Sequence, residues 1–439
     1  MLKIVKFGGS SLASGENFRK VKNIVTSDPA RRVVIVSAPG KRFKEDNKVT
    51  DLLYVCHAHI RYKVSFDDIW SNIADRYTEI ARSCGLSDDI QSILKDVRST
   101  FTTKSSVDDI VSRGEYLNAR LMAEYLGYDF VDAALWLHFN YDGTVDYEKT
   151  YESLRELAKQ HKCMVLPGFY GTLPDGKLHV FSRGGSDVTG AIAAAALSAD
   201  CYENFTDVSG ILMADPKIVE NPKSIERITF SELRELSYMG AEVLHEETVF
   251  PVRQANIPLY IKNTQRPEDA GTLIMESFED ETDDEQLRFI TGITGKKHYT
   301  LITISKNRMK EDLSFIRRIL ELTERYHLHV EHMPSSVDSF SLVISTEELS
   351  YCLHSLIADI QKECAPDSIK VCDGVSLVAS VGRRMAFNSG VSGKVFSALG
   401  ARNINIRMIE QGADEINIIV GVMDADFKET IRTLYDCFT

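Results

Sequence analysis

The sequence predicts an α/β protein with a mainly parallel sheet between helical layers, followed by two smaller ferredoxin-like units of βαββαβ pattern. Apolar, β-branched runs alternate with helix-like segments from residue 3 to about 274, which favours a parallel sheet covered on both faces. An acidic stretch at 276–286 then interrupts the pattern, and short strand–helix–strand–strand units follow it. The 439 residues also exceed what one hydrophobic core usually serves, so two or three domains are expected.

The N-terminal part opens with a strand at Leu2–Phe7 that ends in two glycines. A helix at Ser11–Ser27 and a second apolar strand at Arg32–Ala38 follow. Polar and charged residues dominate Lys41–Lys48, which predicts a mobile surface loop, and the charge-rich stretch Asp51–Glu124 predicts helices. The other elements expected in this part are strands at Met164–Pro167, His179–Phe181 and Cys201–Thr206 and a helix at Asp187–Ser198.

The acidic stretch 276–286 (ESFEDETDDEQ) predicts a solvated linker, because it is nearly free of apolar residues. Beyond it the first small unit is complete, whereas the second lacks its last strand. An unpaired sheet position would leave backbone groups unsatisfied. We therefore expect the apolar run Phe289–Thr294 to supply that strand, with the first unit inserted within the second. The expected domains are 1–280, then 298–373 as the inserted unit, and 287–297 together with 374–439 as the second unit.

Both small units repeat the same order of elements. The first is expected to have strands at 299–305, 327–332, 340–345 and 369–373 and helices at 312–326 and 347–364. The second is expected to have strands from 375, at 404–409 and at 415–422, and helices at 392–401 and 426–435.

Composition argues against several classes of partner. The net charge is −13, from 51 Lys and Arg against 64 Asp and Glu, so no general positive field attracts nucleic acid or an anionic membrane. The eight cysteines are scattered singly without metal-ligand spacing, which predicts no metal site and reduced thiols in a cytoplasmic protein. The N-terminus shows no export signal, and the longest small-apolar run, Val188–Ala199, is too short to span a bilayer.

A first candidate site is the sequence Lys6-Phe7-Gly8-Gly9-Ser10-Ser11 at a strand end. Two glycines let the backbone approach an anion closely, and Lys6 adds a positive charge suited to bridging phosphates. A plain glycine-rich turn is an equally weighted interpretation of these residues alone. The motif is not a Walker loop, because GxxxxGK[ST] is absent.

A second candidate site is Ser182-Arg183-Gly184-Gly185-Ser186-Asp187, directly before a helix of small residues. Arg183 can bind a carboxylate with two hydrogen bonds, while Asp187 can pair with an ammonium group. A site with both groups is suited to an amino acid. Ser186 or Asp187 could also simply cap the helix, and the two roles are compatible.

Two further motifs are weaker when each is taken alone. Thr206-Asp207-Val208-Ser209-Gly210, followed by Ala214-Asp215-Pro216-Lys217, has the polar and turn residues of a nucleotide-facing loop, although most such loops bind nothing. Ser112-Arg113-Gly114-Glu115 by itself predicts a charged helix start.

Together and in this order, the motifs resemble the amino-acid kinase family, specifically aspartokinases. KFGGSS, SRGE, FSRGGSD, TDVSGILMADPK and VLHEETVFPVRQANIPLYIKNT carry the resemblance over about Lys3–Ile274. The tail segment GVSGKVFSALGARNINIRMIEQGADEINIIVGV is similar to the second of the paired ACT domains that aspartokinases carry. Any one motif would be weak, but five in order make accidental agreement very improbable.

The resemblance implies ATP-dependent phosphorylation of the β-carboxylate of L-aspartate to 4-phospho-L-aspartate, the first step of lysine, threonine and methionine biosynthesis. It assigns catalysis to Lys6, Gly9 and Asp187. Aspartate would be bound by Thr50, Glu115, Phe169, Arg183, Gly184, Gly185 and Ser186. ATP would be bound by Lys6, Gly8, Gly9, Ser10, Thr206, Asp207, Leu212, Asp215, Lys217 and Lys262.

The sequence departs from the family at two nucleotide positions. The family often has Tyr where this chain has Leu212 and Arg where it has Lys217, which bears on how the base is held. The phosphoryl chemistry is unaffected. The acceptor carboxylate has a reference pKa of about 3.9 and is already ionised at neutral pH, so no general base is needed. Catalysis then reduces to alignment and charge neutralisation by Lys6, backbone amides and Mg2+.

The ACT pair implies feedback regulation and a homodimer through these domains, or a dimer of dimers. The effector is lysine, threonine or both, and the acids Glu331 and Asp338 favour lysine because it carries two ammonium groups. Ordinary solvated loop charges are an equally weighted interpretation. The residues expected to bind the effector are Met309, Glu331, Ser336, Val337 and Asp338.

Two alternative functions remain beside this one. The first is a kinase of another amino-acid acceptor, against which the paired ACT tail and the SRGE–RGGSD combination argue. The second is an amino-acid sensor without catalysis, which the presence of Lys6, Glu115, Arg183 and Asp187 opposes. A bifunctional kinase–dehydrogenase is not expected, because no segment follows the second ACT unit that could form a Rossmann domain.

Overall fold

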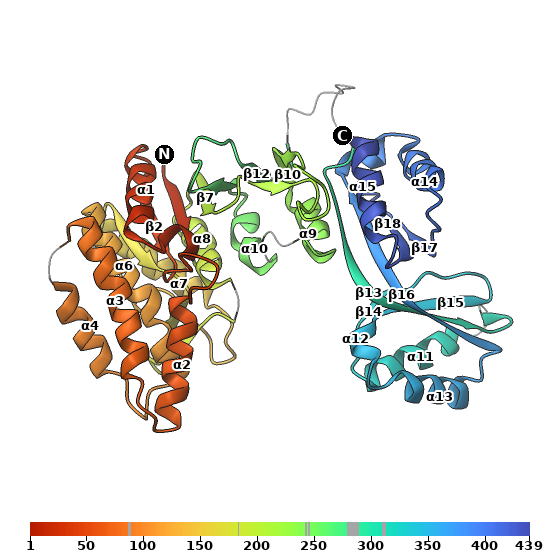
Figure 1. Cartoon of the computed structure of the whole chain (residues 1–439), viewed down its shortest axis with the longest axis horizontal. Helices are drawn as coiled ribbons and strands as arrows, with labels where there is room; N and C mark the ends of the chain where they lie inside the picture. The colour runs from red at the N-terminus through yellow and green to blue at the C-terminus, as the bar shows by residue number, and fades with distance from the viewer. Residues whose placement is uncertain (87–88, 183, 242–243, 245, 279–288, 310–312) are drawn as a thin grey trace. The chain divides into compact units, whose positions relative to one another are not determined.

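The structure, a computed structural model, describes residues 1–86, 89–182, 184–241, 244, 246–278, 289–309 and 313–439. The chain forms two compact units, each described by itself below (Figure 1). The first comprises Met1–Ile211, Ser224–Phe230 and Val243–Glu279, and the second comprises Leu212–Lys223, Ser231–Glu242 and Asp280–Thr439.

An eight-stranded sheet forms the centre of the first unit. Its strand order is β10-β12-β11-β7-β1-β2-β4-β3, and all neighbours are parallel except β11 and β12. The chain runs from β1 outward through β2 and later returns to the other side of β1 as β7. The strands are β1 (Lys3–Phe7), β2 (Arg31–Val36), β3 (Asp129–Phe130), β4 (Met164–Pro167), β7 (Cys201–Thr206), β10 (Arg227–Thr229), β11 (Leu259–Asn263) and β12 (Thr272–Met275).

Helices cover both faces of this sheet, as the alternating sequence pattern predicts. Helix α8 packs against β1, β2 and β7, with α7 and α10 beside it, and α1, α3 and α6 lie on the opposite face. A hairpin of β5 (Tyr170–Thr172) and β6 (Leu178–Val180) stands outside the main sheet. The helices are α1 (Gly15–Thr26), α2 (Val49–Arg61), α3 (Asp67–Cys84), α4 (Asp89–Ser99), α5 (Val107–Val111), α6 (Arg113–Leu126), α7 (Tyr147–Gln160), α8 (Gly185–Ala196) and α10 (Glu246–Gln254).

The core on the α1, α3 and α6 face consists of alternate residues of the central strands and the apolar stripes of the helices. Val5 and Phe7 of β1 and Phe205 of β7 are fully buried there, and the rings of Phe7 and Phe205 stack with centroids 5.0 Å apart. Because side chains alternate along a strand, Lys6 and Asn204 point to the other face, toward α8.

The segment 41–48 is exposed, as expected of a surface loop, except at Asp46, which is buried and hydrogen-bonded. Both oxygens of Asp46 accept hydrogen bonds from Nη2 of buried Arg76 at 2.8 Å, and Arg76 Nη1 donates to the carbonyl of Gly40. Burial opposes the ionised form of Asp46, but the hydrogen bonds of Arg42 and the charge of Arg76 outweigh it and lower the pKa of this carboxyl. The anchor therefore fixes the chain that follows β2.

The second unit contains a six-stranded sheet of order β14-β15-β13-β16-β18-β17, in which every neighbouring pair is antiparallel. The two long strands β13 and β16 lie side by side at its centre (Figure 1). The strands are β13 (Gly292–Ser305), β14 (Val330–His332), β15 (Ser339–Ser345), β16 (Ser368–Val381), β17 (Met408–Glu410) and β18 (Asn417–Met423). The helices are α11 (Leu313–Arg325), α12 (Thr346–Leu349), α13 (Leu353–Cys364), α14 (Val391–Ala401) and α15 (Phe427–Phe438).

Strand β13 belongs to two lobes of this sheet. The first lobe contains β14 and β15, and the second lobe contains β17 and β18. Its first part, from Gly292 to Lys296, pairs with residues 377–381 of β16, and its later part, from Tyr299 to Ser305, pairs with residues 368–375. The second lobe thus receives a strand from the chain that precedes the first lobe. The strand expected at Phe289–Thr294 begins at Gly292, and it continues into the next expected strand through a register shift at 296–299 where His298 has φ of 69°.

Two segments that the sequence pattern groups with the N-terminal part belong to the second unit. In segment 231–242, which holds most of α9 (Phe230–Tyr238), Glu232 forms a 2.8 Å ion pair with Arg383. In segment 212–223, the amide of Lys223 donates to the Tyr435 hydroxyl at 2.9 Å. The short strands β8 (Ile211–Leu212) and β9 (Ser224–Ile225) stand where the chain passes between the units.

Two expectations from composition can be compared with the described residues. All eight cysteines are free thiols rather than disulfides. Within the described parts of the chain, every helix is too short or too polar to cross a membrane. The linker expected at 276–286 falls mostly outside the described residues.

Candidate active site

The candidate site lies in the first unit at the carboxyl ends of β1, β2, β4 and β7. In open α/β sheets, ligands bind outside the carboxyl ends of the strands where the strand order reverses, and here that point is between β1 and β7. The glycine turn 8–10 follows β1, and Thr206 ends β7. The parallel arrangement therefore gathers motifs that are distant in the sequence.

Lys6 and Asp187 form the charged centre of the site. Lys6 Nζ lies 2.5 Å from Asp187 Oδ1, and the lysine side chain is only 8% exposed. Asp187 stands in the first turn of α8, and its Oδ1 also accepts a 2.8 Å hydrogen bond from Asn204 Nδ2. A buried ammonium paired with one carboxylate can neutralise developing charge on a transferring phosphoryl group.

The glycine turn leaves backbone amides accessible beside this ammonium. Gly8 donates to the Phe205 carbonyl, and a Cβ on Gly8 would lie 3.6 Å from Lys6 Nζ. Among the described residues, the amides of Gly9 and Ser10 have no hydrogen-bond partner. The carbonyl of Gly9 accepts a 2.8 Å bond from the amide of Gly40, which joins the loops after β1 and β2. This turn can approach an anion without an intervening side chain.

The close contact between the two loops gives a stability prediction. A Cβ on Gly40 would lie 2.6 Å from Gly9 C and 2.7 Å from Ser10 N, both backbone atoms, so Gly40→Ala is expected to destabilise the protein by about 1–3 kcal/mol. Gly8→Ala is the matched control: Gly8 has φ of −70° and its Cβ would make ordinary contacts at 3.6 and 3.7 Å, so it should be neutral or slightly stabilising. Urea unfolding of both variants measures the difference, and equal midpoints would contradict it.

Helix α8 begins against a strained residue. Phe169, which follows β4, has φ of 80°, an unusual conformation for a bulky side chain, and its amide donates to Thr189 Oγ1 at 3.1 Å. A Cβ on Gly185 would lie 2.7 Å from the Phe169 ring, and a Cβ on Gly168 would lie 2.7 Å from Ser186. Gly184, with φ of 60°, caps the helix. These contacts bring Phe169, Gly184, Gly185 and Ser186 together.

Glu115 is a buried carboxyl group beside the loop that follows β2. It lies in the first turn of α6, is 4% exposed, and its Oε2 has no hydrogen-bond partner in the described structure. Burial raises the pKa of this carboxyl to about 8, although a hydrogen bond from the Ala38 amide favours the charged form. A Cβ on Gly114 would lie 2.8 Å from the Cβ of Ala38, so glycine is needed for α6 to approach this loop. An unpaired buried carboxyl is suited to receive a cation.

Thr50 and three nucleotide-side residues also lie in the first unit. Thr50 is in the first turn of α2, which begins where Val49 donates to the Pro39 carbonyl, so it joins the loop that follows β2. Thr206 ends β7 and donates to Asp207 Oδ1 at 3.1 Å. Lys262 is half-buried on β11 opposite Phe205 in the register, beside the same end of β7.

Three of the remaining predicted positions belong to the second unit, and one lies outside the described residues. Leu212, Asp215 and Lys217 belong to the second unit, where Asp215 Oδ1 accepts a bond from the Lys217 amide in an exposed turn. Arg183 lies outside the described residues.

The predicted effector residues all lie in the first lobe of the second unit, in different environments. Met309 is 2% exposed and belongs to the lobe's core, whereas Val337 is 60% exposed on the β14–β15 turn with Ser336. Asp338 Oδ1 accepts a 3.0 Å bond from the Arg308 amide. Glu331 already contacts the Tyr299 hydroxyl at 3.2 Å and Lys296 Nζ at 3.6 Å, and its Oε2 has no hydrogen-bond partner among the described residues.

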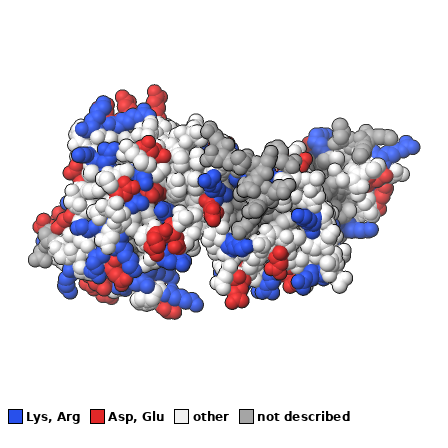
Figure 2. All heavy atoms as spheres, turned by 90° about the horizontal axis from the view of Figure 1, so that it is seen from above, with Lys and Arg blue, Asp and Glu red and all other residues white. Residues whose placement is uncertain are grey.

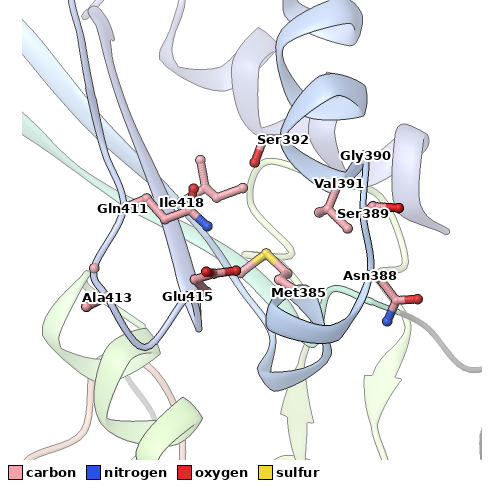
Figure 3. A pocket seen from close by; sticks show the side chains of 11 residues that line it. Met385, Asn388, Ser389, Gly390, Val391, Ser392, Gln411, Ala413, Glu415 and Ile418 are labelled. Atoms are coloured by element: carbon pink, nitrogen blue, oxygen red, sulfur yellow. The ribbon is translucent and has the colours of Figure 1, made fainter.

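A pocket of about 400 Å3 in the second lobe was not predicted from the sequence. Figure 3 shows it between the turn that enters α14 and the turn that joins β17 to β18. Glu415 supplies a carboxylate, and Asn388, Ser392 and Gln411 supply uncharged polar groups. The glycine and serine residues before α14 are the sequence signal that could have indicated it. The pocket combines an acid with uncharged polar groups on a scale that suits a small amino acid.

The surface charges agree with the composition. Figure 2 shows Lys and Arg side chains interspersed with Asp and Glu over the visible face, rather than gathered into a basic patch. A phosphate ligand therefore depends on locally placed groups such as Lys6.

Comparisons with known proteins agree with this architecture. The model of the amino acid kinase family matches residues 1–263, and an ACT domain model matches residues 378–438. Aspartokinase 3 of Bacillus subtilis (strain 168) is 37% identical over 455 residues, covering 100% of this chain and 98% of the relative. A crystal structure of Clostridium acetobutylicum aspartate kinase matches with a TM-score of 0.92 and 48% identity over 100% of both chains. Escherichia coli aspartokinase III in complex with lysine and aspartate (T-state) matches with a TM-score of 0.73 and 25% identity, covering 100% of this chain and 99% of that one.

The chain belongs to the amino acid kinase family, with ACT domains in its C-terminal part. Its activity is that of an aspartate kinase, which phosphorylates aspartate at the expense of a nucleotide. The family, fold class and enzyme class predicted from the motifs are thus confirmed, and a kinase of another acceptor or a sensor without catalysis is not favoured.

Proposed function

We propose that the residues gathered at the carboxyl ends of β1, β2, β4 and β7 carry out the phosphoryl transfer from ATP to the β-carboxylate of L-aspartate. One observation supports this most directly: buried Lys6 lies 2.5 Å from Asp187, beside the glycine turn at the point where the strand order reverses. In this proposal Lys6 and the amides of Gly9 and Ser10 hold the phosphate oxygens. Asp187 keeps the ammonium of Lys6 in position.

Aspartate would lie at the carboxyl ends of the strands, beside the first turns of α6 and α8. Arg183 binds its α-carboxylate, and Phe169, Ser186 and Thr50 line its site. Glu115 receives the α-ammonium group, whose positive charge would favour the ionised form of this buried carboxyl. The reacting β-carboxylate is ionised at neutral pH, so the residues need only align it with the phosphorus atom and neutralise charge.

Magnesium is proposed to enter with the nucleotide. Among the described residues there is no cluster of three or more His, Cys, Asp or Glu side chains that could enclose a metal. Mg2+ commonly keeps water ligands and binds through substrate phosphates, so this arrangement is compatible with it. The ion would supply charge neutralisation on the phosphates. The residues proposed to bind the nucleotide are Thr206, Asp207, Leu212, Asp215, Lys217 and Lys262.

We propose three functional domains: a catalytic domain at 1–280, a first ACT domain at 298–373, and a second ACT domain formed by 287–297 with 374–439. The proposed effector is lysine. Segments 212–223 and 231–242 lie within the catalytic domain by sequence, but they belong to the same compact unit as the ACT domains. In this proposal they connect effector binding to catalysis. We further propose a homodimer formed through the ACT domains and a cytoplasmic location.

The first test is an ADP-release assay with ATP, Mg2+ and aspartate, repeated with excess lysine. The expected result is aspartate-dependent turnover that lysine suppresses. Turnover insensitive to lysine would refute the effector and redirect the search to threonine. Folded protein without aspartate-dependent turnover would refute the kinase proposal itself.

The position of the effector can be tested by two matched carboxamide substitutions. Asp338→Asn removes an acid from the exposed turn of the first lobe, and Glu415→Gln removes one from the pocket of the second lobe. Losing a charge-assisted contact with a lysine ammonium is expected to raise the lysine concentration for half-inhibition about 10-fold or more. We expect this effect for Asp338→Asn, with Glu415→Gln near wild type. The reverse outcome would move the effector to the second-lobe pocket.

A further inference from the structure

We propose that Asn204 is a positioning residue of the phosphoryl-transfer site, which holds the carboxylate of Asp187 so that Lys6 stays aligned. The inference rests on the proposed function of Lys6 and Asp187. No motif in the sequence singles out Asn204, which stands in the middle of the buried strand β7.

An asparagine is an unusual residue at this position. Strand interiors favour β-branched and aromatic side chains, and asparagine is depleted there. Asn204 is 3% exposed, between fully covered Tyr202 and Phe205 of the same strand. A buried amide lowers stability unless its polar atoms are hydrogen-bonded, so packing alone would favour an apolar side chain.

Among the described residues, the side chain of Asn204 forms its hydrogen bond with Asp187. Its Nδ2 donates to Asp187 Oδ1 at 2.8 Å, while its Oδ1 has no hydrogen-bond partner among the described residues. An ionised carboxylate only accepts hydrogen bonds. The NH2 group of Asn204, and not its carbonyl oxygen, therefore faces Asp187. The side chain thus leaves one of its own atoms unsatisfied in order to bind Asp187.

The sheet register places Asn204 beside Lys6. The two residues are paired across the parallel strands β1 and β7, and their side chains point to the same face, toward α8. Both donate to the same atom, Asp187 Oδ1, from adjacent strands. No described residue forms a hydrogen bond with Oδ2 of Asp187.

This arrangement explains why a second donor is useful. When phosphate oxygens approach Lys6, they compete with Asp187 for its ammonium group. A carboxylate held by Lys6 alone could turn away at that moment, whereas the bond from Asn204 keeps it in place. Asn204 therefore acts through Asp187 on the transfer step, and its loss should lower kcat more than it changes the KM for aspartate.

Two substitutions at this position test the inference. Asn204→Leu keeps the size and removes the donor, and it is expected to lower kcat about 10- to 100-fold with the KM for aspartate within about threefold of wild type. In Asn204→Asp, the introduced carboxyl is buried next to Asp187, so both burial and like charge raise its pKa. Protonated, it can donate to Asp187 as the amide does, and ionised, it repels Asp187.

The activity of the Asn204→Asp variant should therefore increase, relative to wild type, as the pH falls. Its kcat relative to wild type is expected to rise at least about 10-fold between roughly pH 8.5 and pH 6. A general loss of stability would not give this pH response. Ile261→Val is the matched control, because Ile261 neighbours Asn204 in the register on β11 and is 3% exposed, and its kcat ratio to wild type should stay near one at every pH.

The outcomes separate the inference from the function on which it rests. A pH-independent ratio for Asn204→Asp in an active wild-type background would overturn the positioning role alone. Wild-type protein without aspartate-dependent turnover would instead overturn the proposed function. If Asn204→Leu does not fold, the pH response of Asn204→Asp carries the test by itself.

Discussion

Replacing Lys6 with methionine is expected to lower kcat by about 10^2- to 10^3-fold, the usual effect of removing one charge-stabilising donor from an active site. Methionine keeps most of the length and volume of the stem but removes the ammonium that lies 2.5 Å from Asp187. The bond from Asn204 still holds the carboxylate, so the variant should remain folded. Steady-state kinetics with saturating ATP and aspartate measure the loss.

Lys3→Met is the control for this experiment. Lys3 stands on the same strand, and its ammonium forms a 2.9 Å ion pair with Asp28 away from the glycine turn. Its replacement should change kcat by less than about twofold, because a partly exposed ion pair contributes little even to stability. A kcat for Lys6→Met within about threefold of wild type would show that the phosphates are neutralised by other groups.

Glu115→Gln is expected to stabilise the protein at alkaline pH and to weaken aspartate binding at the same time. The pKa of Glu115 is raised from 4.5 to about 8 by burial, so between these values the folded state holds a proton that the unfolded state has released. The free energy of unfolding of the wild type therefore falls as the pH rises through this window. Glutamine does not titrate, so its stability does not fall in this window. The free energy of unfolding of Glu115→Gln should therefore exceed that of the wild type by at most about 5 kcal/mol above pH 8.

Urea unfolding at about pH 5 and about pH 9 measures this difference. The exposed Glu148→Gln on α7 is the control, and it should show no pH-dependent change. In the same samples, the KM for aspartate of Glu115→Gln should rise about 10-fold or more, because the neutral amide cannot pair with the ammonium of aspartate. A Glu115→Gln variant that is less stable than wild type at the higher pH would mean that the carboxylate is paired in the free enzyme.

Much of the site could be predicted because a parallel sheet gathers strand ends. Lys6, Phe169 and Thr206 each follow or end an apolar run, and the fold places all such positions at one edge. The glycines before α8 indicated a close approach of the backbone, which the contact between Gly185 and Phe169 explains.

Other features leave no local signal in the sequence. Asn204 is an uncommon residue within a strand, but the sequence does not show its partner, since its role depends on a carboxylate 17 residues away. Arg76 anchors Asp46 from 30 residues along the chain, so the charged segment around Asp46 looked mobile. The apolar face of α9 does not specify its partner, and the association of segment 231–242 with the second unit follows from long-range contacts such as that of Glu232 with Arg383.

Strands β13 and β16 each run through both lobes of the second unit. The ladder between β13 and β16 has one stretch in each lobe, and the register shifts at 296–299 and 299–301 where the two stretches meet. Because β13 and β16 run from one lobe into the other, unfolding of one lobe is expected to disturb the paired strands of the other, so the six strands should melt in one cooperative transition. An effector bound to one lobe should therefore slow amide hydrogen exchange along the whole length of both strands. The slower exchange should include the residues of the lobe that does not contact the effector.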